Sequence, residues 1–128
     1  MEVISAKDFL KLNTKKSRKR KYNNNFVELD GYIFASQLEA DYYAELVFRQ
    51  KANEISSFVI QPRYLLQKSF EKDGKKYKKI EYVADFEIKH LDDSIEVIDT
   101  KGVKTDVFRI KEKMFHKIYP YKLTIVTK

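Results

Sequence analysis

The residues best suited to chemistry are two acids and a lysine that follow apolar segments. Three of residues 95–98 are apolar and β-branched, and this segment leads into Asp99 and, two residues later, Lys101. Because alternate residues of a strand point to the same side of a sheet, we expect these two side chains to project together. Asp85 follows a similar apolar segment, residues 82–84. Two adjacent strands ending in these acids would form a cation site with a lysine beside it.

Phosphodiester hydrolysis needs this set of groups. The charge on the phosphate must be offset, a water must be deprotonated and the leaving alkoxide must be stabilised. A bound Mg²⁺ or Mn²⁺ can meet these needs with only a few carboxylate ligands. We expect Asp85, Asp99 and the carbonyl of Thr100 to supply ligands. Lys101 would orient or deprotonate the water. An isolated Asp-x-Lys is common, however: Asp99 and Lys101 also fit an exposed charged pair at a strand end, and Asp85 also fits a strand cap or a surface ion pair.

The composition predicts one well-solvated globular domain. The chain has 128 residues, of which 43% are hydrophobic and 35% charged. The absence of cysteine excludes a disulfide framework, a thiolate zinc site and a cysteine nucleophile, and it fits a reducing cytoplasm. No segment approaches the roughly 20 apolar residues of a membrane span, and the N-terminus has no apolar signal-peptide core.

Most of the net charge of +7 lies in a short arm. Its cations are Lys15, Lys16, Arg18, Lys19, Arg20 and Lys21. Because the charge is local, a polyanion is the expected partner, with DNA favoured over an anionic membrane. No apolar face accompanies the run, which argues against membrane insertion. A solvated tail is the alternative.

The hydrophobic periodicity predicts an α/β fold with a mixed sheet. The expected elements are a short helix at 5–12, a hairpin at 26–34, a helix at 36–52, strands at 55–60, 64–66, 77–88 and 95–100, a helix at 106–118 and a strand at 123–126. The closing strand–helix–strand unit should pair two parallel strands through a right-handed crossover. Helices should therefore cover the faces of the sheet.

The two longer helices have expected caps and buried faces. Ser36 and Glu39 have the spacing of a capping box, and Thr105 is the expected cap of the second helix. In the first helix, Leu38, Tyr42 and Leu46 are expected to form one apolar stripe, with Ala35, Tyr43 and Val47 beside it. In the second, Val107, Ile110, Met114 and Ile118 are expected to share one face, with Phe108 and Phe115 adjoining.

These residues and their order resemble the PD-(D/E)XK phosphodiesterase superfamily. The superfamily's order of helix, three strands, helix and strand covers residues 36–126. The resemblance assigns Asp85 as the first acid, Asp99, Thr100 and Lys101 as the second acid, spacer and lysine, and Glu39 as an additional metal-binding acid. It implies a restriction-endonuclease-like core in a nuclease domain at 26–128, preceded by the basic arm at 1–25. Ala84 replaces the proline of the name-giving motif.

A narrower resemblance is to small phage and prophage proteins assigned to this superfamily. It is carried by Phe34-x-Ser36-x-x-Glu39-Ala40-x-Tyr42-Tyr43, Gln61-Pro62, Tyr82-x-Ala84-Asp85-Phe86 and Asp99-Thr100-Lys101-Gly102. It implies that Gln61 lies near the metal, although Gln61 also fits an ordinary strand end. It further implies a homodimer that acts on branched DNA, such as a Holliday junction, in a bacterial host cell.

Four cations after the candidate site are expected to contact DNA phosphates. They are Lys104, Arg109, Lys111 and Lys113. With the arm they would form a positive track, although each also fits a solvated helix face. The predicted activity is metal-dependent DNA cleavage. Two alternatives are a DNA-binding module of the same fold without useful catalysis, and cleavage of RNA.

Overall fold

The computed structural model of this chain describes residues 26–127. The helix expected at 5–12 and the basic arm lie outside the described residues. The described residues divide into two compact units, residues 26–53 and residues 54–127, and each is described by itself.

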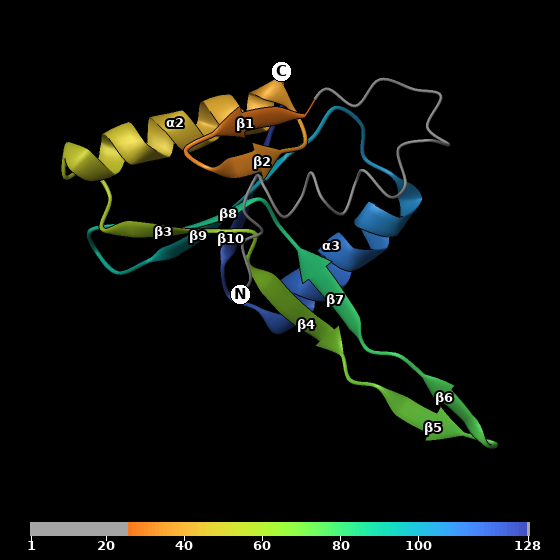
Figure 1. Cartoon of the computed structure of the whole chain (residues 1–128). Coiled ribbons are helices and arrows are strands. Elements are labelled where there is room, and N and C mark those ends of the chain that lie inside the picture. The colour runs from red at the N-terminus through yellow and green to blue at the C-terminus, as the bar shows by residue number, and fades with distance from the viewer. Residues whose placement is uncertain (1–25, 128) are drawn as a thin grey trace. The chain divides into compact units, whose positions relative to one another are not determined.

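The first unit opens with the hairpin that the sequence predicts. Strands β1 (Val27–Leu29) and β2 (Tyr32–Phe34) pair in antiparallel fashion, with Val27 opposite Phe34 (Figure 1). Asp30 and Gly31 join them with φ angles of 53° and 82°. A turn with two positive φ values matches the twist of the flanking strands, which is why an Asp-Gly pair predicts it.

Helix α2 (Gln37–Lys51) follows, and its start is confirmed. The hydroxyl of Ser36 accepts a hydrogen bond from the N–H of Glu39 at 3.1 Å. The expected buried stripe is shifted, however, because the buried residues are Glu39, Ala40, Tyr43 and Leu46, whereas Leu38 and Tyr42 are half-buried. Tyr43 explains this shift: its ring meets those of Tyr32 and Phe34, and its hydroxyl donates to Asp30 at 3.0 Å.

A four-stranded mixed sheet forms the centre of the second unit. Its order is β10 (Lys122–Val126), β9 (Ile95–Thr100), β8 (Phe86–Lys89) and β3 (Ser57–Ile60). Strands β3, β8 and β9 are antiparallel neighbours, and β9 and β10 are parallel. Helix α3 (Asp106–Ile118) connects the parallel pair, as the sequence predicts, and Thr105 caps its start.

The prediction of one long strand at 77–88 is wrong, because the chain changes its pairing partner twice within these residues. Its residues belong to β6 (Lys75–Tyr77), β7 (Ile80–Val83) and β8. Strand β7 pairs with β4 (Arg63–Gln67), and β6 pairs with β5 (Phe70–Lys72). Between β3 and β8 the chain therefore runs out along the β4–β7 ladder to the β5–β6 hairpin and returns (Figure 1).

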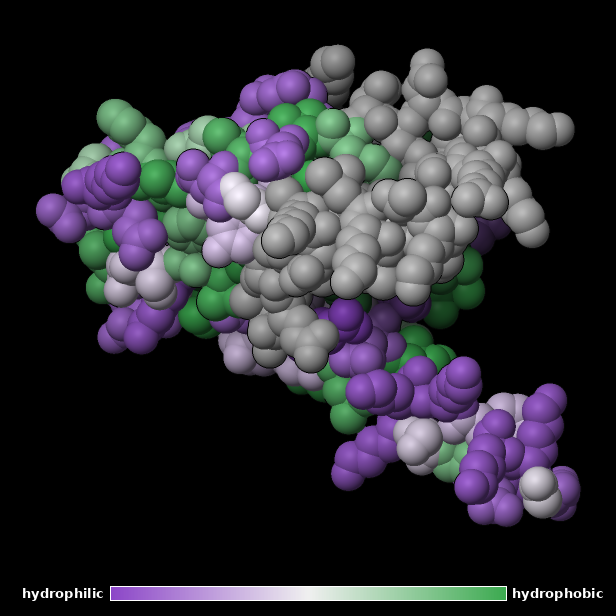
Figure 2. Space-filling model, viewed as in Figure 1, coloured by the Kyte–Doolittle hydropathy of each residue, from purple (hydrophilic) through white to green (hydrophobic). Residues whose placement is uncertain are grey.

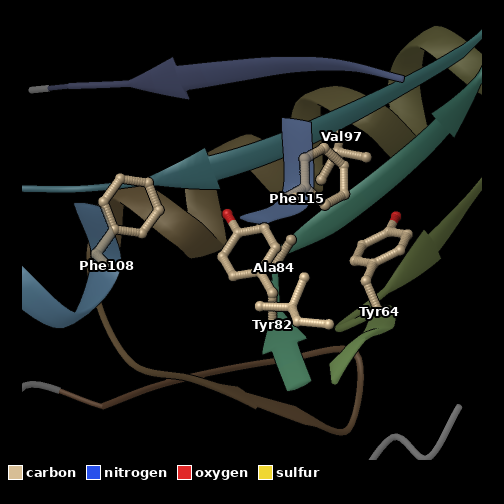
Figure 3. Close-up of a cluster of buried hydrophobic side chains, with 7 residues drawn as sticks. Tyr64, Tyr82, Ala84, Val97, Phe108 and Phe115 are labelled. Atoms are coloured by element: carbon tan, nitrogen blue, oxygen red, sulfur yellow. The ribbon is translucent and has the colours of Figure 1, made fainter. Parts of the chain in front are cut away.

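Aromatic side chains fill the core between the sheet and α3. The cluster is Tyr64, Leu66, Tyr82, Ala84, Val97, Phe108 and Phe115 (Figure 3). The ring of Tyr82 lies 5.5 Å from that of Phe115 and 6.0 Å from that of Phe108.

The buried side of α3 is the one with Phe108 and Phe115, which the sequence placed beside the main apolar face, and Met114 of that face packs against the core cluster. Phe108 and Phe115 are buried, whereas Val107, Ile110 and Ile118 are 62%, 60% and 48% exposed. The rings of Phe108 and Phe115 pack against the aromatic side chains of β4 and β7 and fill more volume than the aliphatic side chains would. The helix therefore turns its aromatic side toward the core. The rest of the aliphatic stripe is left on the outside.

The described residues therefore form a mixed α/β fold with several small sheets and two helices. Neither α2 nor α3 is long and apolar enough to cross a membrane.

Candidate active site

The register of β8 and β9 brings Asp85 and Asp99 together. Phe86 pairs with Ile98, and the N–H of Asp85 donates to the carbonyl of Ile98 at 3.1 Å. Asp85 therefore lies at the end of this register, beside the last residues of β9. Its carboxyl group is close enough to that of Asp99 to share a hydrogen bond and to be affected by its charge.

Thr100 holds the Asp85 carboxylate by two hydrogen bonds, and burial raises the pKa of this acid. Its Oδ2 accepts hydrogen bonds from the N–H of Thr100 at 2.7 Å and from the Thr100 hydroxyl at 2.8 Å. Burial, with the neighbouring charge and hydrogen bond of Asp99, raises the pKa of Asp85 from 3.8 to about 6, although the two Thr100 bonds oppose this shift. The site therefore concentrates negative charge that a cation would stabilise.

Asp99 is the more deeply buried acid, at 3% exposure. Its Oδ2 accepts a hydrogen bond from the Tyr82 hydroxyl at 2.5 Å and lies 3.2 Å from Nζ of Lys101. The Lys101 ammonium also lies 4.3 Å from the centre of the Phe108 ring. The expected juxtaposition of Asp99 and Lys101 is confirmed, and the ring and carboxylate together fix the position of the ammonium.

Tyr82 is a site residue that the sequence reasoning did not assign. Burial, followed by its hydrogen bond to Asp99, raises the pKa of its hydroxyl well above the ordinary value, so the hydroxyl stays a donor. Tyr82 belongs to the Tyr82-x-Ala84-Asp85 motif, so the sequence does contain a pointer to it. Its role depends on a hydrogen bond from β7 to β9, and no pattern within one strand predicts a bond between strands that do not pair with each other.

Gln61 lies next to Asp85 through the backbone. Its N–H donates to the Asp85 carbonyl at 2.8 Å, and its φ angle of 52° is unusual for a residue other than glycine. One residue on, the carbonyl of Pro62 accepts the N–H of Ala84 at 3.1 Å. A proline at position 84 would have no N–H to donate, which gives a structural reason for the departure from the name-giving motif.

Not all predicted site residues are brought together by the described contacts. Glu39 lies on α2 in the first unit, so its part in a metal site stays a prediction. Lys104 pairs with Glu112 at 3.7 Å, Arg109 and Lys113 are exposed on α3, and Lys111 is half-buried there. Their contact with DNA also stays a prediction.

The oxygens around Asp85 and Asp99 fit one Mg²⁺ that keeps several waters. Within residues 26–127, no group of three or more His, Cys, Asp or Glu side chains has metal-binding spacing. Two carboxylates are nevertheless enough for Mg²⁺ in many enzymes. The Thr100 carbonyl could offer a third oxygen, because the N–H and C=O of a strand residue point to the same side and this N–H faces Asp85.

A family model described as "Protein of unknown function (DUF1064)" matches residues 19–128. The chain belongs to this family. Neither the curated proteins nor the solved structures contain a match. For this DUF1064 chain, the functional argument therefore rests on the chemistry of the site.

Proposed function

We propose that this protein is a metal-dependent nuclease that hydrolyses phosphodiester bonds in DNA. The observation that carries the proposal is the convergence of Asp85, Asp99 and Lys101. Asp85 lies close enough to Asp99 for that acid to raise its pKa, and the Lys101 ammonium lies 3.2 Å from Asp99. A cluster with a buried acid of raised pKa beside a second acid is unfavourable for stability alone, which favours a functional role.

In this proposal, each residue has a definite task. Asp85 and Asp99 hold the cation, with the Thr100 carbonyl as a further ligand, and the bound Mg²⁺ or Mn²⁺ would offset phosphate charge and favour ionisation of water. Thr100 fixes the orientation of Asp85 by two hydrogen bonds. Tyr82 fixes Asp99 by one. The Lys101 ammonium orients the attacking water or binds a phosphate oxygen.

The order of the elements supports a restriction-endonuclease-like core as part of the proposal. Helix α2, strands β3, β8 and β9, helix α3 and strand β10 follow in the order helix, three strands, helix, strand. Asp85 directly precedes β8, and Asp99 and Thr100 end β9. The β4–β7 ladder and β5–β6 hairpin are then an insertion between the first and second core strands. Action on branched DNA in the cytoplasm of a bacterial host belongs to the same proposal.

The test is cleavage of supercoiled, linear and four-way-junction DNA with Mg²⁺, Mn²⁺ or EDTA. We expect the wild type to cut at least one of these DNAs with either ion and none in EDTA. Asp85→Asn and Lys101→Met should each lower the single-turnover rate by about 100-fold or more, a typical loss for a group that stabilises developing charge. Lys122→Met is the matched control, because it removes an exposed lysine at the start of β10 that belongs to neither the acidic pair nor the predicted DNA-binding residues.

Two results would overturn the proposal. One is the lack of any cutting by the folded wild type with either ion. The other is equal cutting by wild type and Asp85→Asn, which would assign the activity to another site or to a contaminant. Cleavage of RNA alone would keep the chemistry but reject the DNA substrate.

A further inference from the structure

The β5–β6 hairpin is a fully exposed projection with no role in the core. It continues beyond the β4–β7 ladder, and every residue from 67 to 79 is exposed (Figure 1). Its surface is mostly hydrophilic (Figure 2). Asp73 and Gly74, with φ angles of 51° and 76°, form its tight turn. A projection of this kind does not contribute a hydrophobic core, so its side chains call for another explanation.

The hairpin and its flanks form a positive surface. Residues 68–79 contain six lysines and two acids. The lysines are Lys68, Lys72, Lys75, Lys76, Lys78 and Lys79, and the acids are Glu71 and Asp73. This concentration attracts a polyanion over the range of a Debye length.

The two faces of the hairpin differ in charge. In the β5–β6 register, Phe70 lies opposite Tyr77, Glu71 opposite Lys76, and Lys72 opposite Lys75. Since opposite residues and alternate residues share a face, one face contains Phe70, Lys72, Lys75 and Tyr77. The other face contains Glu71 and Lys76, whose charges cancel. The positive charge within the paired strands is therefore concentrated on the aromatic face.

An aromatic pair packs across that face. The rings of Phe70 and Tyr77 stack with centroids 4.8 Å apart and planes 13° apart, while 46% and 39% of these residues stay exposed. The Lys75 ammonium lies 5.1 Å from the centre of the Tyr77 ring. An isolated two-stranded hairpin is only marginally stable, and a cross-strand aromatic pair offsets this. The ring pair thus stabilises the hairpin that carries the two lysines.

The hairpin is connected to the candidate active site by a short, paired path. The β4–β7 ladder starts beside Asp85, where Gln61 donates to its carbonyl and Pro62 accepts from Ala84. From Arg63 to Lys72, the extended chain spans at most about 30 Å. A DNA duplex bound at Asp85 would therefore be long enough to contact the hairpin as well.

We propose that the face formed by Phe70, Lys72, Lys75 and Tyr77 binds the phosphate backbone of DNA. This inference rests on the proposed function, because it supplies a binding surface for the DNA that is cut at Asp85 and Asp99. Lys72 and Lys75 bind phosphates as point charges, and the stacked rings hold the two strands in place. A two-stranded ribbon also has the right width for the major groove. Such contacts position the duplex and do not select its sequence.

The test is duplex DNA binding by the full chain in EDTA over a series of salt concentrations. The variant is Lys72→Gln/Lys75→Gln, and the control is Lys76→Gln/Lys117→Gln, which removes equal charge from the opposite hairpin face and the end of α3. If each lysine of the proposed face contacts one phosphate, the variant should flatten the slope of log affinity against log salt by roughly 2. The control should lose less than half as much. Equal slopes for wild type and variant, or equal losses in variant and control, would overturn the inference.

A second measurement separates this inference from the proposed function. In single-turnover cleavage with Mg²⁺, Lys72→Gln/Lys75→Gln should need more protein for half-maximal rate than the control Lys76→Gln/Lys117→Gln, because its DNA binding is weaker while the acids and Lys101 remain. A wild type that cuts DNA while the variant keeps the full salt slope rejects the hairpin surface alone. A flattened slope in the variant with no cutting by the wild type supports the hairpin surface and rejects the nuclease.

Discussion

Thr100 donates two hydrogen bonds to one oxygen of Asp85. Its N–H lies 2.7 Å and its hydroxyl 2.8 Å from Oδ2. The spacer residue between Asp99 and Lys101 therefore holds the acid of the neighbouring strand. In the proposed nuclease, Thr100 is a positioning residue for Asp85.

Thr100→Val should lower DNA cleavage with little loss of fold stability. Valine keeps the shape and the backbone N–H but removes one hydrogen bond to a carboxylate, worth about 1.5–3 kcal/mol. If most of this energy positions Asp85 during reaction, the rate should fall about tenfold or more. Single-turnover cleavage measured over a Mg²⁺ series checks this, and the variant should need more Mg²⁺ for half-maximal rate.

Thr124→Val is the matched control. The Thr124 hydroxyl donates to Oε2 of Glu96 at 2.5 Å, so this change also removes a hydroxyl–carboxylate bond from the same sheet. The bond is outside the acidic pair, and the rate should stay near that of the wild type. Equal losses in both variants would mean that the effect is on stability and not on Asp85.

Asp85→Asn should raise thermal stability at pH 7 in EDTA. The folded-state pKa of Asp85 is raised from 3.8 to about 6, so the folded protein holds this proton more tightly than the unfolded chain does. The stabilising effect of that proton is complete below pH 4 and is lost as the pH rises through 6. Ionised Asp85 then costs on the order of 3 kcal/mol, or about 10 °C in Tm, which asparagine avoids.

Thermal unfolding at several pH values measures this effect. The advantage of the variant should disappear near pH 4, and added Mg²⁺ at pH 7 should raise the Tm of wild type more than that of the variant. Asp92→Asn is a control of opposite sign, because hydrogen bonds from Ser94 lower the pKa of Asp92. A variant that is less stable than wild type at pH 7 would show that the ionised carboxylate does not strain the fold.

Glu39→Gln separates a helix-capping role from a metal-binding role. Ser36 caps α2 through the N–H of Glu39, which glutamine retains, so the Tm should change little. If the carboxylate binds the metal, cleavage should fall sharply and the Mg²⁺ requirement should rise. Ser36→Ala is the complementary change and should cost about 1 kcal/mol of stability without altering the metal requirement. Full activity in Glu39→Gln would restrict Glu39 to a structural role.

If the protein forms the predicted homodimer through the outer face of α3, Ile110→Glu should shift it from dimer to monomer. The outer face of α3, with Val107, Ile110 and Ile118, is apolar and exposed. The helix starts at Asp106 and ends in basic residues, so two copies of α3 packed antiparallel would bring unlike charges together. Light scattering during gel filtration measures the mass. Leu91→Glu is the control, since Leu91 is 65% exposed in a turn outside this face. A monomeric wild type would contradict this prediction.

The sequence alone determined the local features. Asp99 and Lys101 share a face because the period of a strand is two residues, whatever the strand packs against. The two Asp-Gly turns and the caps at Ser36 and Thr105 also depend on neighbouring residues only. The parallel pairing of β9 and β10 follows from the short α3 crossover between them.

The tertiary structure decided which strands pair with each other and which side of each helix is buried. The apolar pattern of residues 77–88 fits one strand, yet β7 pairs with β4 and β8 pairs with β3, so the two belong to different sheets. Helix α3 has two apolar sides, and only the aromatic surface of β4 and β7 selects the side with Phe108 and Phe115. The bonds of Tyr82 to Asp99 and of Thr100 to Asp85 join residues that are 17 and 15 positions apart. Such bonds depend on strand register, and a periodicity within one segment carries no information about its register with another.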